Sequence, residues 1–319
     1  MQWTERVGRR LKLRDLHILL AVVQHRSMAK AAIALAISQP AVSKAIGDME
    51  NALGVRLLDR GRHGVEPTAY GLALVKRGRA VFDELKTGVE ELHFLADPTV
   101  GELRLGSAES IAAGALPAIL NRFSHQNPRV HVAIAQALFA TMQYRELRER
   151  SIDLLLGRIP QPFAENDLEA DILFDDPPRV VIGKGSKWAR CRALTLADLA
   201  NEQWVLAPPD TLAGSLTADL FRANGLDTPR APLTTLSIHL YCQLAASGRF
   251  VTVLPTSVLH FRAKALGLKV LPIKLPTQPR PVAFVKLRNR MLSPVAQRFV
   301  ECAREITKPL RTRQVQTKT

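Results

Sequence analysis

The chain has 319 residues, of which 47% are hydrophobic, and a formal net charge of +15. This length and composition allow two domains and exclude a wholly disordered or fibrous chain. No apolar stretch approaches the roughly 20 residues that span a bilayer, the N-terminus does not resemble a signal peptide, and three widely spaced cysteines do not form a disulfide framework. We therefore expect a cytoplasmic protein with no membrane partner, and the positive charge favours a polyanionic partner such as nucleic acid.

The positive charge is unevenly distributed along the chain. Residues 1–98 carry a net charge of +4, residues 99–279 carry +3, and residues 280–319 carry +8. Half of the excess therefore lies in the last forty residues, and charge alone does not locate a binding surface.

The first predicted elements are three helices. An amphipathic pattern predicts a helix over residues 13–23, Ser27 is a good N-cap for a helix over 28–35, and Ser38 caps a third helix with Pro40 in its first turn. The apolar positions of the third helix repeat at helical spacing and form its buried face: Val42, Ile46, Met49 and Leu53.

The opposite face of the third helix begins with Gln39, Ser43, Lys44 and Gly47, which are short or polar. A helix that reads the major groove needs small side chains and places its N-terminal residues against base edges. Gln39 can pair with adenine, and Ser43 and Lys44 can reach bases or phosphates. The alternative is a structural three-helix domain with a solvated polar face.

Two short extended pieces around a basic turn follow the third helix, at residues 55–60 and 61–65. This pattern predicts a β-wing beside the helix. The predicted DNA-binding residues are Ser27, Ser38, Gln39, Pro40, Ser43, Lys44, Arg60, Arg62 and Thr68.

The N-terminal motif resembles the signature of LysR-type transcriptional regulators. The resemblance covers residues 38–46, matching positions within 49–60, and 66–71 after the wing. Lys44 stands where the family usually has arginine, and Leu58 where it usually has phenylalanine. Because lysine lacks the guanidinium fork, we expect Lys44 to contact phosphate rather than read a base in bidentate fashion.

The resemblance extends over the whole chain and implies its fold class, which is α/β. It implies an all-α-dominated winged helix-turn-helix N-terminal domain and a C-terminal half of two Rossmann-like subdomains that resemble periplasmic binding proteins. The expected domains are residues 1–68 for DNA binding, 69–97 for a linker helix, and 98–319 for effector binding, with subdomain I at about 98–173 and 275–308 and subdomain II at about 174–274.

The linker helix is predicted to start at Thr68 and to run to about Leu95. Its apolar residues follow the 3-4-3 spacing of a coiled-coil-like seam, at Phe82, Leu85, Val89 and Leu92. The alternative is a helix packed on its own domain. The resemblance implies an antiparallel helix pair that builds a homodimer, which would read an inverted repeat in double-stranded promoter DNA; family members often assemble as homotetramers.

After residue 98, short apolar runs alternate with helical patterns, which predicts parallel sheets covered on both faces. The predicted strands cover residues 101–108, 130–137, 153–159, 179–183, 204–207, 250–254, 268–273 and 281–287. The predicted helices cover residues 112–126, 139–149, 215–224, 239–246 and 294–306, and a polar tail over 311–319 is expected to be disordered.

Open parallel sheets bind ligands outside the carboxyl ends of their strands, so polar residues at those ends are candidates. The candidates at these ends and at the border of the second subdomain are Ser107, Glu109, Ser110, Arg158 and Thr211. The family resemblance implies two more effector-binding residues, Gln136 in an effector-contacting loop and Gly248 in a turn similar to the family's Gly-rich turn. Three alternatives stay open. Ser107 is equally suited to cap the following helix. Arg158 is suited to clamp an effector carboxylate, to pair with an acid across the hinge or to be an exposed structural arginine. Glu109 opposes an anion and suggests a hydroxyl-bearing or partly cationic ligand instead.

These features predict a sequence-specific transcription regulator that is not an enzyme, because the sequence lacks nucleophile-elbow, metalloprotease and phosphate-loop motifs. We expect no cofactor and no metal. The expected partners are promoter DNA, a second copy of the chain, RNA polymerase and a small effector, which is an aromatic or sugar acid or, as the alternative, a neutral sugar. The rival function is non-specific DNA binding.

Overall fold

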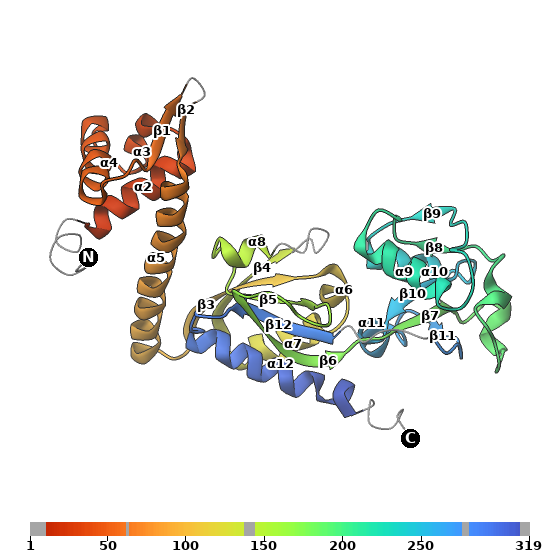
Figure 1. Ribbon diagram of the computed structural model, residues 1–319. Coiled ribbons are helices and arrows are strands. Elements are labelled where there is room, and N and C mark those ends of the chain that lie inside the picture. The colour runs from red at the N-terminus through yellow and green to blue at the C-terminus, as the bar shows by residue number, and fades with distance from the viewer. Residues whose placement is uncertain (1–10, 62–63, 137–143, 276–280, 313–319) are drawn as a thin grey trace. The chain divides into compact units, whose positions relative to one another are not determined.

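The structure is a computed structural model that describes residues 11–61, 64–136, 144–275 and 281–312. The chain divides into two compact units, Met1–Val89 and Glu90–Thr319 (Figure 1). Within the described ranges, no helix has both the length and the apolar character that crossing a membrane requires.

The N-terminal unit is a winged helix-turn-helix domain. Three helices come first: α2 (Leu13–His25), α3 (Met28–Ala34) and α4 (Gln39–Leu53). An antiparallel hairpin and the long linker helix follow: β1 (Leu58–Gly61), β2 (Gly64–Pro67) and α5 (Ala69–Ala96). Leu19, Val22, Val42 and Met49 are fully buried at its centre.

The local sequence explains where these helices begin and end. The hydroxyl oxygen of Ser27 accepts a hydrogen bond from the Lys30 amide, and that of Ser38 accepts one from the Ala41 amide, both at 3.3 Å. These bonds confirm the two predicted N-caps. Helix α4 ends at Gly54, whose φ of +72° suits glycine.

The first sheet of the C-terminal unit has five strands in the order β4-β3-β5-β12-β6. Their bounds are β3 (Val100–Ser107), β4 (Arg129–Gln136), β5 (Leu154–Arg158), β6 (Leu168–Asp175) and β12 (Pro281–Leu287). Helices α6 (Glu109–Ala112), α7 (Leu116–Gln126) and α12 (Pro294–Thr312) contribute to the core on one face, and the short α8 (Arg145–Arg148) lies against the other.

The second sheet has three strands in the order β10-β7-β11, and a separate two-stranded sheet pairs β8 with β9. The bounds are β7 (Pro178–Gly183), β8 (Val205–Leu206), β9 (Leu233–Thr234), β10 (Thr252–Pro255) and β11 (Leu268–Val270). The associated helices are α9 (Leu212–Arg222), α10 (Ile238–Ala246) and α11 (Thr256–Arg262), with 3-10 turns η2 (Lys187–Arg190) and η3 (Ala197–Leu199). Trp204 is fully buried in this lobe, and its indole N–H donates to the Leu199 carbonyl at 2.8 Å.

The prediction of purely parallel sheets is wrong. Strands β4, β3 and β5 pair in parallel, but β12 runs antiparallel to β5 and β6, and β7 runs antiparallel to β10 and β11. The chain leaves the first sheet through β6, builds the second sheet, and returns through β12. A strand that returns at the end where β6 left must run in the opposite direction.

Several boundaries also differ from the predictions. The helix predicted over 112–126 is not continuous, since α6 ends at Ala112 and α7 begins at Leu116. Between them Gly114 lies close to α11, where an added Cβ would be 3.2 Å from the Ser257 hydroxyl. Helix α12 continues through Arg311, so this residue does not belong to a disordered tail. Its guanidinium donates to the carbonyls of Ile172, at 2.8 Å, and Leu173.

Candidate DNA-binding and ligand-binding sites

Helix α4 presents a polar face to solvent at its N-terminal end. Gln39, Pro40 and Lys44 are exposed and Ser43 is half-buried. A Cβ added to Gly47 would have no neighbour within 4 Å, so this face is also free of bulk further along the helix. The arrangement fits a helix that enters a DNA groove N-terminal end first.

The wing is tied to the helices on both sides. The Glu50 carboxylate in α4 accepts hydrogen bonds from the Leu57 amide at 2.7 Å and the Leu58 amide at 3.2 Å. At the other strand, the Val65 amide donates to the Arg26 carbonyl at 3.1 Å. These contacts fix the hairpin relative to α4, and residue-by-residue reading of the sequence did not find them.

Glycine is required where the wing meets the end of α2. Gly64 has a φ of +110°, and a Cβ there would lie 2.7 Å from the Arg26 carbonyl oxygen. A larger residue would push the hairpin away from α2. Of the predicted wing contacts, Arg62 and the side chain of Arg60 lie outside the described part of the chain.

Thr68 joins the wing to the linker helix. Its hydroxyl donates to the Arg56 carbonyl at 2.7 Å and accepts from the Gly71 amide at 3.1 Å. Ser27, Ser38 and Thr68 therefore use their side-chain oxygens inside the domain. Their contact with DNA stays a prediction, and it would have to use their remaining hydrogen-bonding capacity or their backbone groups.

The linker helix α5 changes its surroundings along its length. Its first half packs on the DNA-binding domain, where a Cβ on Gly78 would lie 2.9 Å from a methyl of Leu16 and the ring centre of Phe82 lies 5.4 Å from that of His17. Phe82 therefore packs on its own domain, as the alternative interpretation held. Four apolar side chains of the second half are exposed: Leu85 by 48%, Val89 by 49%, Leu92 by 66% and Leu95 by 79%.

Ser107 ends β3 and is almost completely buried. It does not cap the following helix, because Ala108 occupies the N-cap position of α6 and makes no side-chain bond there. Glu109 and Ser110 follow in the first turn of α6 and are half-buried. The capping role considered for Ser107 is therefore wrong, and its place at the end of β3 agrees with the prediction.

Three other predicted ligand residues lie away from these. Gln136 is exposed at the end of β4. Thr211 caps α9, since its hydroxyl accepts from the Gly214 amide at 3.1 Å and donates to the Pro208 carbonyl at 2.6 Å. Gly248 has a φ of +77° in the turn after α10.

Arg158 pairs with an acid at the crossing between the two sheets, which is one of the alternatives that the sequence left open. Its guanidinium lies 2.7 Å from the fully buried carboxylate of Asp176, which follows β6. The same carboxylate accepts hydrogen bonds from the amide and the hydroxyl of Ser257 in α11, both at 2.7 Å. Asp176 therefore joins the end of β5 to the start of α11.

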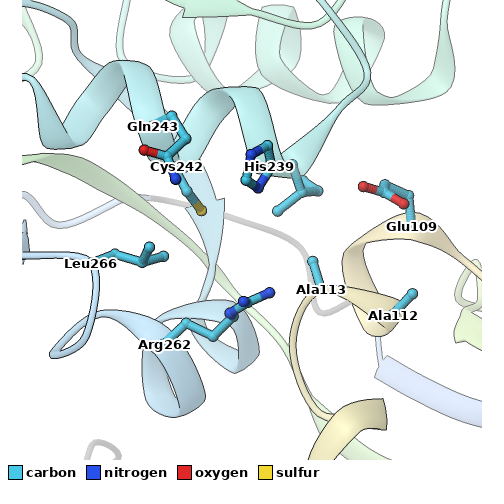
Figure 2. Close-up of a pocket in the computed structure, with 9 residues that line it drawn as sticks. Glu109, Ala112, Ala113, His239, Cys242, Gln243, Arg262 and Leu266 are labelled. Atoms are coloured by element: carbon cyan, nitrogen blue, oxygen red, sulfur yellow. The ribbon is translucent and has the colours of Figure 1, made fainter.

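A cavity of about 230 Å³ lies between α6, α10 and α11 (Figure 2). Glu109 is the single predicted effector residue on its wall. The lining residues are Glu109, Ala112 and Ala113 from α6, Ile238, His239, Cys242 and Gln243 from α10, and Arg262 and Leu266 from α11 and the turn after it. The predicted residues are thus divided between this cavity, the ends of the strands and structural caps.

Charge and burial act in opposite directions on the thiol in this cavity. Burial raises the pKa of Cys242, and the positive charge of Arg262 partly offsets the increase. The guanidinium of Arg262 therefore acts on the same interior that the thiol lines. Sequence reading missed His239, Cys242, Gln243 and Arg262 as site residues, because they lie within helices and at a helix end rather than at the ends of strands.

Comparison with known families gives two matches that together cover most of the chain. A family described as "LysR substrate binding domain" matches residues 96–308. A second, described as "Bacterial regulatory helix-turn-helix protein, lysR family", matches residues 13–72.

Individual relatives and structures agree with these matches. The chain is 29% identical over 289 residues to the HTH-type transcriptional regulator GbpR of Azospirillum brasilense, covering 90% of this chain and 84% of that protein. Full-length OxyR from Pseudomonas aeruginosa matches with a TM-score of 0.64 at 20% identity, covering 93% of this chain and 95% of that one. Full-length CbnR in complex with its target DNA matches with a TM-score of 0.52 at 23% identity, covering 93% and 100%. At these identities the structural matches speak for the fold.

Proposed function

Since the chain belongs to the LysR family of transcriptional regulators, which are not enzymes, we propose that it controls a specific promoter in response to a small organic acid. It has the helix-turn-helix DNA-binding domain and the effector-binding domain of that family. The observation that carries the proposal is the two family matches in sequence order, with the polar face of α4 exposed at the start of the first.

We place the N-terminal end of α4 in the major groove. Gln39 reads an adenine edge, while Ser43 and Lys44 contact bases or phosphates. Arg60 and Arg62 follow the phosphate backbone from the wing. The support for this arrangement is the exposed, unbulky face of α4 and the bonds from Glu50 that hold the wing beside it.

We propose that two copies pair through the second half of α5. Four exposed apolar residues on that half support the pairing, because a stripe of this kind costs free energy unless a partner covers it. A two-fold pair would place two α4 helices on an inverted repeat. A tetramer would consist of two such pairs.

The cavity between α6 and the α10–α11 pair is the ligand site that we propose for this chain. Its mixed wall suits a small polar molecule, and Ser107 and Ser110 flank Glu109 at the same end of β3. A ligand held here contacts both lobes and therefore stabilises one relative arrangement of them over others. Through that change the effector would alter how the dimer sits on DNA and meets RNA polymerase. A neutral sugar is the alternative ligand.

The test is a binding titration of the full chain with DNA from upstream of its own coding sequence and with a scrambled duplex of equal length. A sequence-specific regulator should bind the cognate DNA on the order of 10³-fold more tightly. Equal affinities for the two duplexes would instead establish non-specific DNA binding. Transcription in vitro with purified RNA polymerase then gives the sign of regulation.

A further inference from the structure

Two opposite charges line the cavity without being satisfied by the protein. Within the described residues, neither the Glu109 carboxylate nor the Arg262 guanidinium has an ion-pair or hydrogen-bond partner. Figure 2 shows both groups directed toward the interior from different walls, Glu109 from α6 and Arg262 from the end of α11. They do not pair with each other.

This situation differs from that of other charges in the same unit. Arg104 pairs with Asp153 at 2.5 Å, and Arg304 pairs with Asp171 at 2.6 Å. Glu109 is half-buried, so its carboxylate loses hydration that no partner among the described residues offsets, whereas Arg262 is exposed and keeps its hydration. An acid and a base that face one cavity unpaired can both be satisfied by a ligand that carries the two complementary charges.

We propose that the effector of this cavity is zwitterionic, with an ammonium group and a carboxylate, as in an α-amino acid. The ammonium group binds Glu109, which as a carboxylate only accepts hydrogen bonds, and the ligand carboxylate binds the Arg262 fork. This inference rests on the proposed function, which supplies a ligand at this site, and narrows its ligand class from organic acids in general.

The remaining wall of the cavity fits such a ligand. His239 and Gln243 offer further hydrogen bonds, while Ala112, Ala113, Ile238 and Leu266 supply an apolar surface for a side chain. The volume of about 230 Å³ corresponds to about eight waters at roughly 30 Å³ each. A ligand of amino-acid size fills this space. A simple carboxylate would satisfy Arg262 and leave Glu109 unpaired.

The experiment uses the full-length chain and matched sets of ligands. The twenty protein-forming L-amino acids are first screened at 10 mM by thermal shift. Each one that stabilises the chain is then titrated calorimetrically beside its deaminated acid and its decarboxylated amine, for example phenylalanine beside 3-phenylpropanoate and 2-phenylethylamine. We expect at least one amino acid to bind more than tenfold more tightly than both partners.

Two substitutions assign the two charges. Glu109→Gln should reduce the preference for the amino acid over the deaminated acid to less than threefold, and Arg262→Gln should do the same for the preference over the amine. Lys264→Gln is the matched control, since Lys264 is exposed two residues from Arg262 and does not line the cavity. The control should leave both preferences unchanged.

The zwitterion proposal is overturned if no amino acid binds, if the deaminated acid or the amine binds as tightly, or if neither substitution changes the preferences. The cognate and scrambled duplexes are titrated in parallel without ligand. A chain that distinguishes the duplexes and responds to a plain acid or a sugar would remove the amino-acid class alone. A chain that does not distinguish them would remove the proposed function.

Discussion

Gln39 lies in the first turn of α4, where its exposed amide makes no hydrogen bond with the described part of the domain. A glutamine that pairs in bidentate fashion with adenine contributes about 1–3 kcal/mol to discrimination against the wrong base. Gln39→Ala should therefore lose about this much discrimination at one base pair, measured by titrating duplexes that carry single base changes. Asn51→Ala, at an exposed position near the other end of α4, is the control. If Gln39→Ala keeps the full set of preferences, Gln39 does not read a base.

Glu50 holds the wing through two backbone amides, those of Leu57 and Leu58. Glu50→Ala leaves both donors without their acceptor, which costs about 1–3 kcal/mol of unfolding free energy for each buried group left unsatisfied. Chemical denaturation of the full chain, followed at the N-terminal unit, measures this loss. Asp48→Ala removes an exposed acid from the same helix and should change the stability by less than about 0.5 kcal/mol. Equal effects of the two substitutions would show that the Glu50 bonds do not stabilise the wing.

The candidate residues show which features of the two sites can be predicted from local sequence. Ser38, Gln39 and the buried face of α4 follow from capping and helical spacing, which are local properties. Glu109 was found because it follows a strand. Arg262 was not, because its place in the cavity depends on how α11 lies against α6, which is set by contacts between residues far apart in the chain.

Among the elements, the second half of α5 has the clearest consequence for assembly. Leu92→Glu together with Val89→Asp places two negative charges on the exposed stripe. The double substitution should shift the protein from dimer to monomer, because burying these carboxylates in the contact between copies without opposite charges costs free energy. Sedimentation equilibrium measures the change, and circular dichroism checks that the helices remain.

The matched control for the stripe is Leu72→Glu. Leu72 is 56% exposed on the same helix, and at 3.6 residues per turn it lies about 200° around the axis from Leu92. Leu72→Glu should leave the mass of the assembly, as measured by sedimentation equilibrium, unchanged. A dimer that persists in the Leu92–Val89 variant would place the contact between copies elsewhere.

The ion cluster of Arg104, Asp153 and Arg290 joins β3, the start of β5 and the segment after β12. Burial alone would raise the pKa of Asp153, but hydrogen bonds from Arg104 and the charges of Arg104 and Arg290 lower it below its ordinary value. A carboxyl with a lowered pKa in the folded state stabilises the fold above the unfolded-state pKa of about 3.9, and this contribution is lost as the pH falls through the folded value.

The unfolding free energy of the C-terminal unit should therefore decrease below about pH 4. Asp153→Asn should be less stable at neutral pH and should show a shallower decrease in that range, measured by urea denaturation between pH 3 and 7. Asp171→Asn, which removes an exposed ion pair with Arg304, serves as the control. If the unfolding free energy of Asp153→Asn decreased with falling pH as steeply as that of the unmodified chain, this cluster would not be the cause of the decrease.

Whether a segment forms a helix or a strand was easier to predict than which elements lie next to it in the fold. The helices of the N-terminal unit and strands β3, β4 and β12 follow from periodicity. Strand β6 was missed because Glu169 and Asp171 interrupt its apolar pattern; in the fold they pair with Lys286 and Arg304 from β12 and α12. The direction of β12 has no local signal, because it depends on the path of the whole chain.

At the scale of the whole molecule, the +8 charge of residues 280–319 has a structural use. Six basic side chains of this region are bonded within the C-terminal unit: Lys286 to Glu169, Arg288 to the carbonyls of Asn166 and Leu168, Arg290 to Asp153, Arg298 to the Pro98 carbonyl, Arg304 to Asp171, and Arg311 to the carbonyls of Ile172 and Leu173. They hold strand ends and helix α12 in place. These six side chains, which belong to the most basic part of the chain, thus take part in holding the fold.

The salt dependence of DNA affinity distinguishes these cations from those that contact DNA. Removing one phosphate contact reduces the slope of log affinity against log salt concentration by about 1. Lys44→Gln should therefore reduce the slope by about 1, whereas Arg304→Gln should leave it unchanged, in titrations between 50 and 200 mM salt. An equal reduction by both would mean that the C-terminal unit also contacts the duplex.

Asp176 gives the C-terminal unit a fixed point between its two lobes. Its carboxylate is bonded to Arg158 on one lobe and to Ser257 on the other, and Gly114, directly after the cavity residue Ala113, lies against the same Ser257. A rotation that keeps these bonds turns about this point, so displacement grows with distance from it. The cavity wall adjoins this point, because Gly114 directly follows Ala113 in the wall. For such a rotation, a ligand that drew the cavity walls together by a small amount would displace the far edge of the second lobe the most.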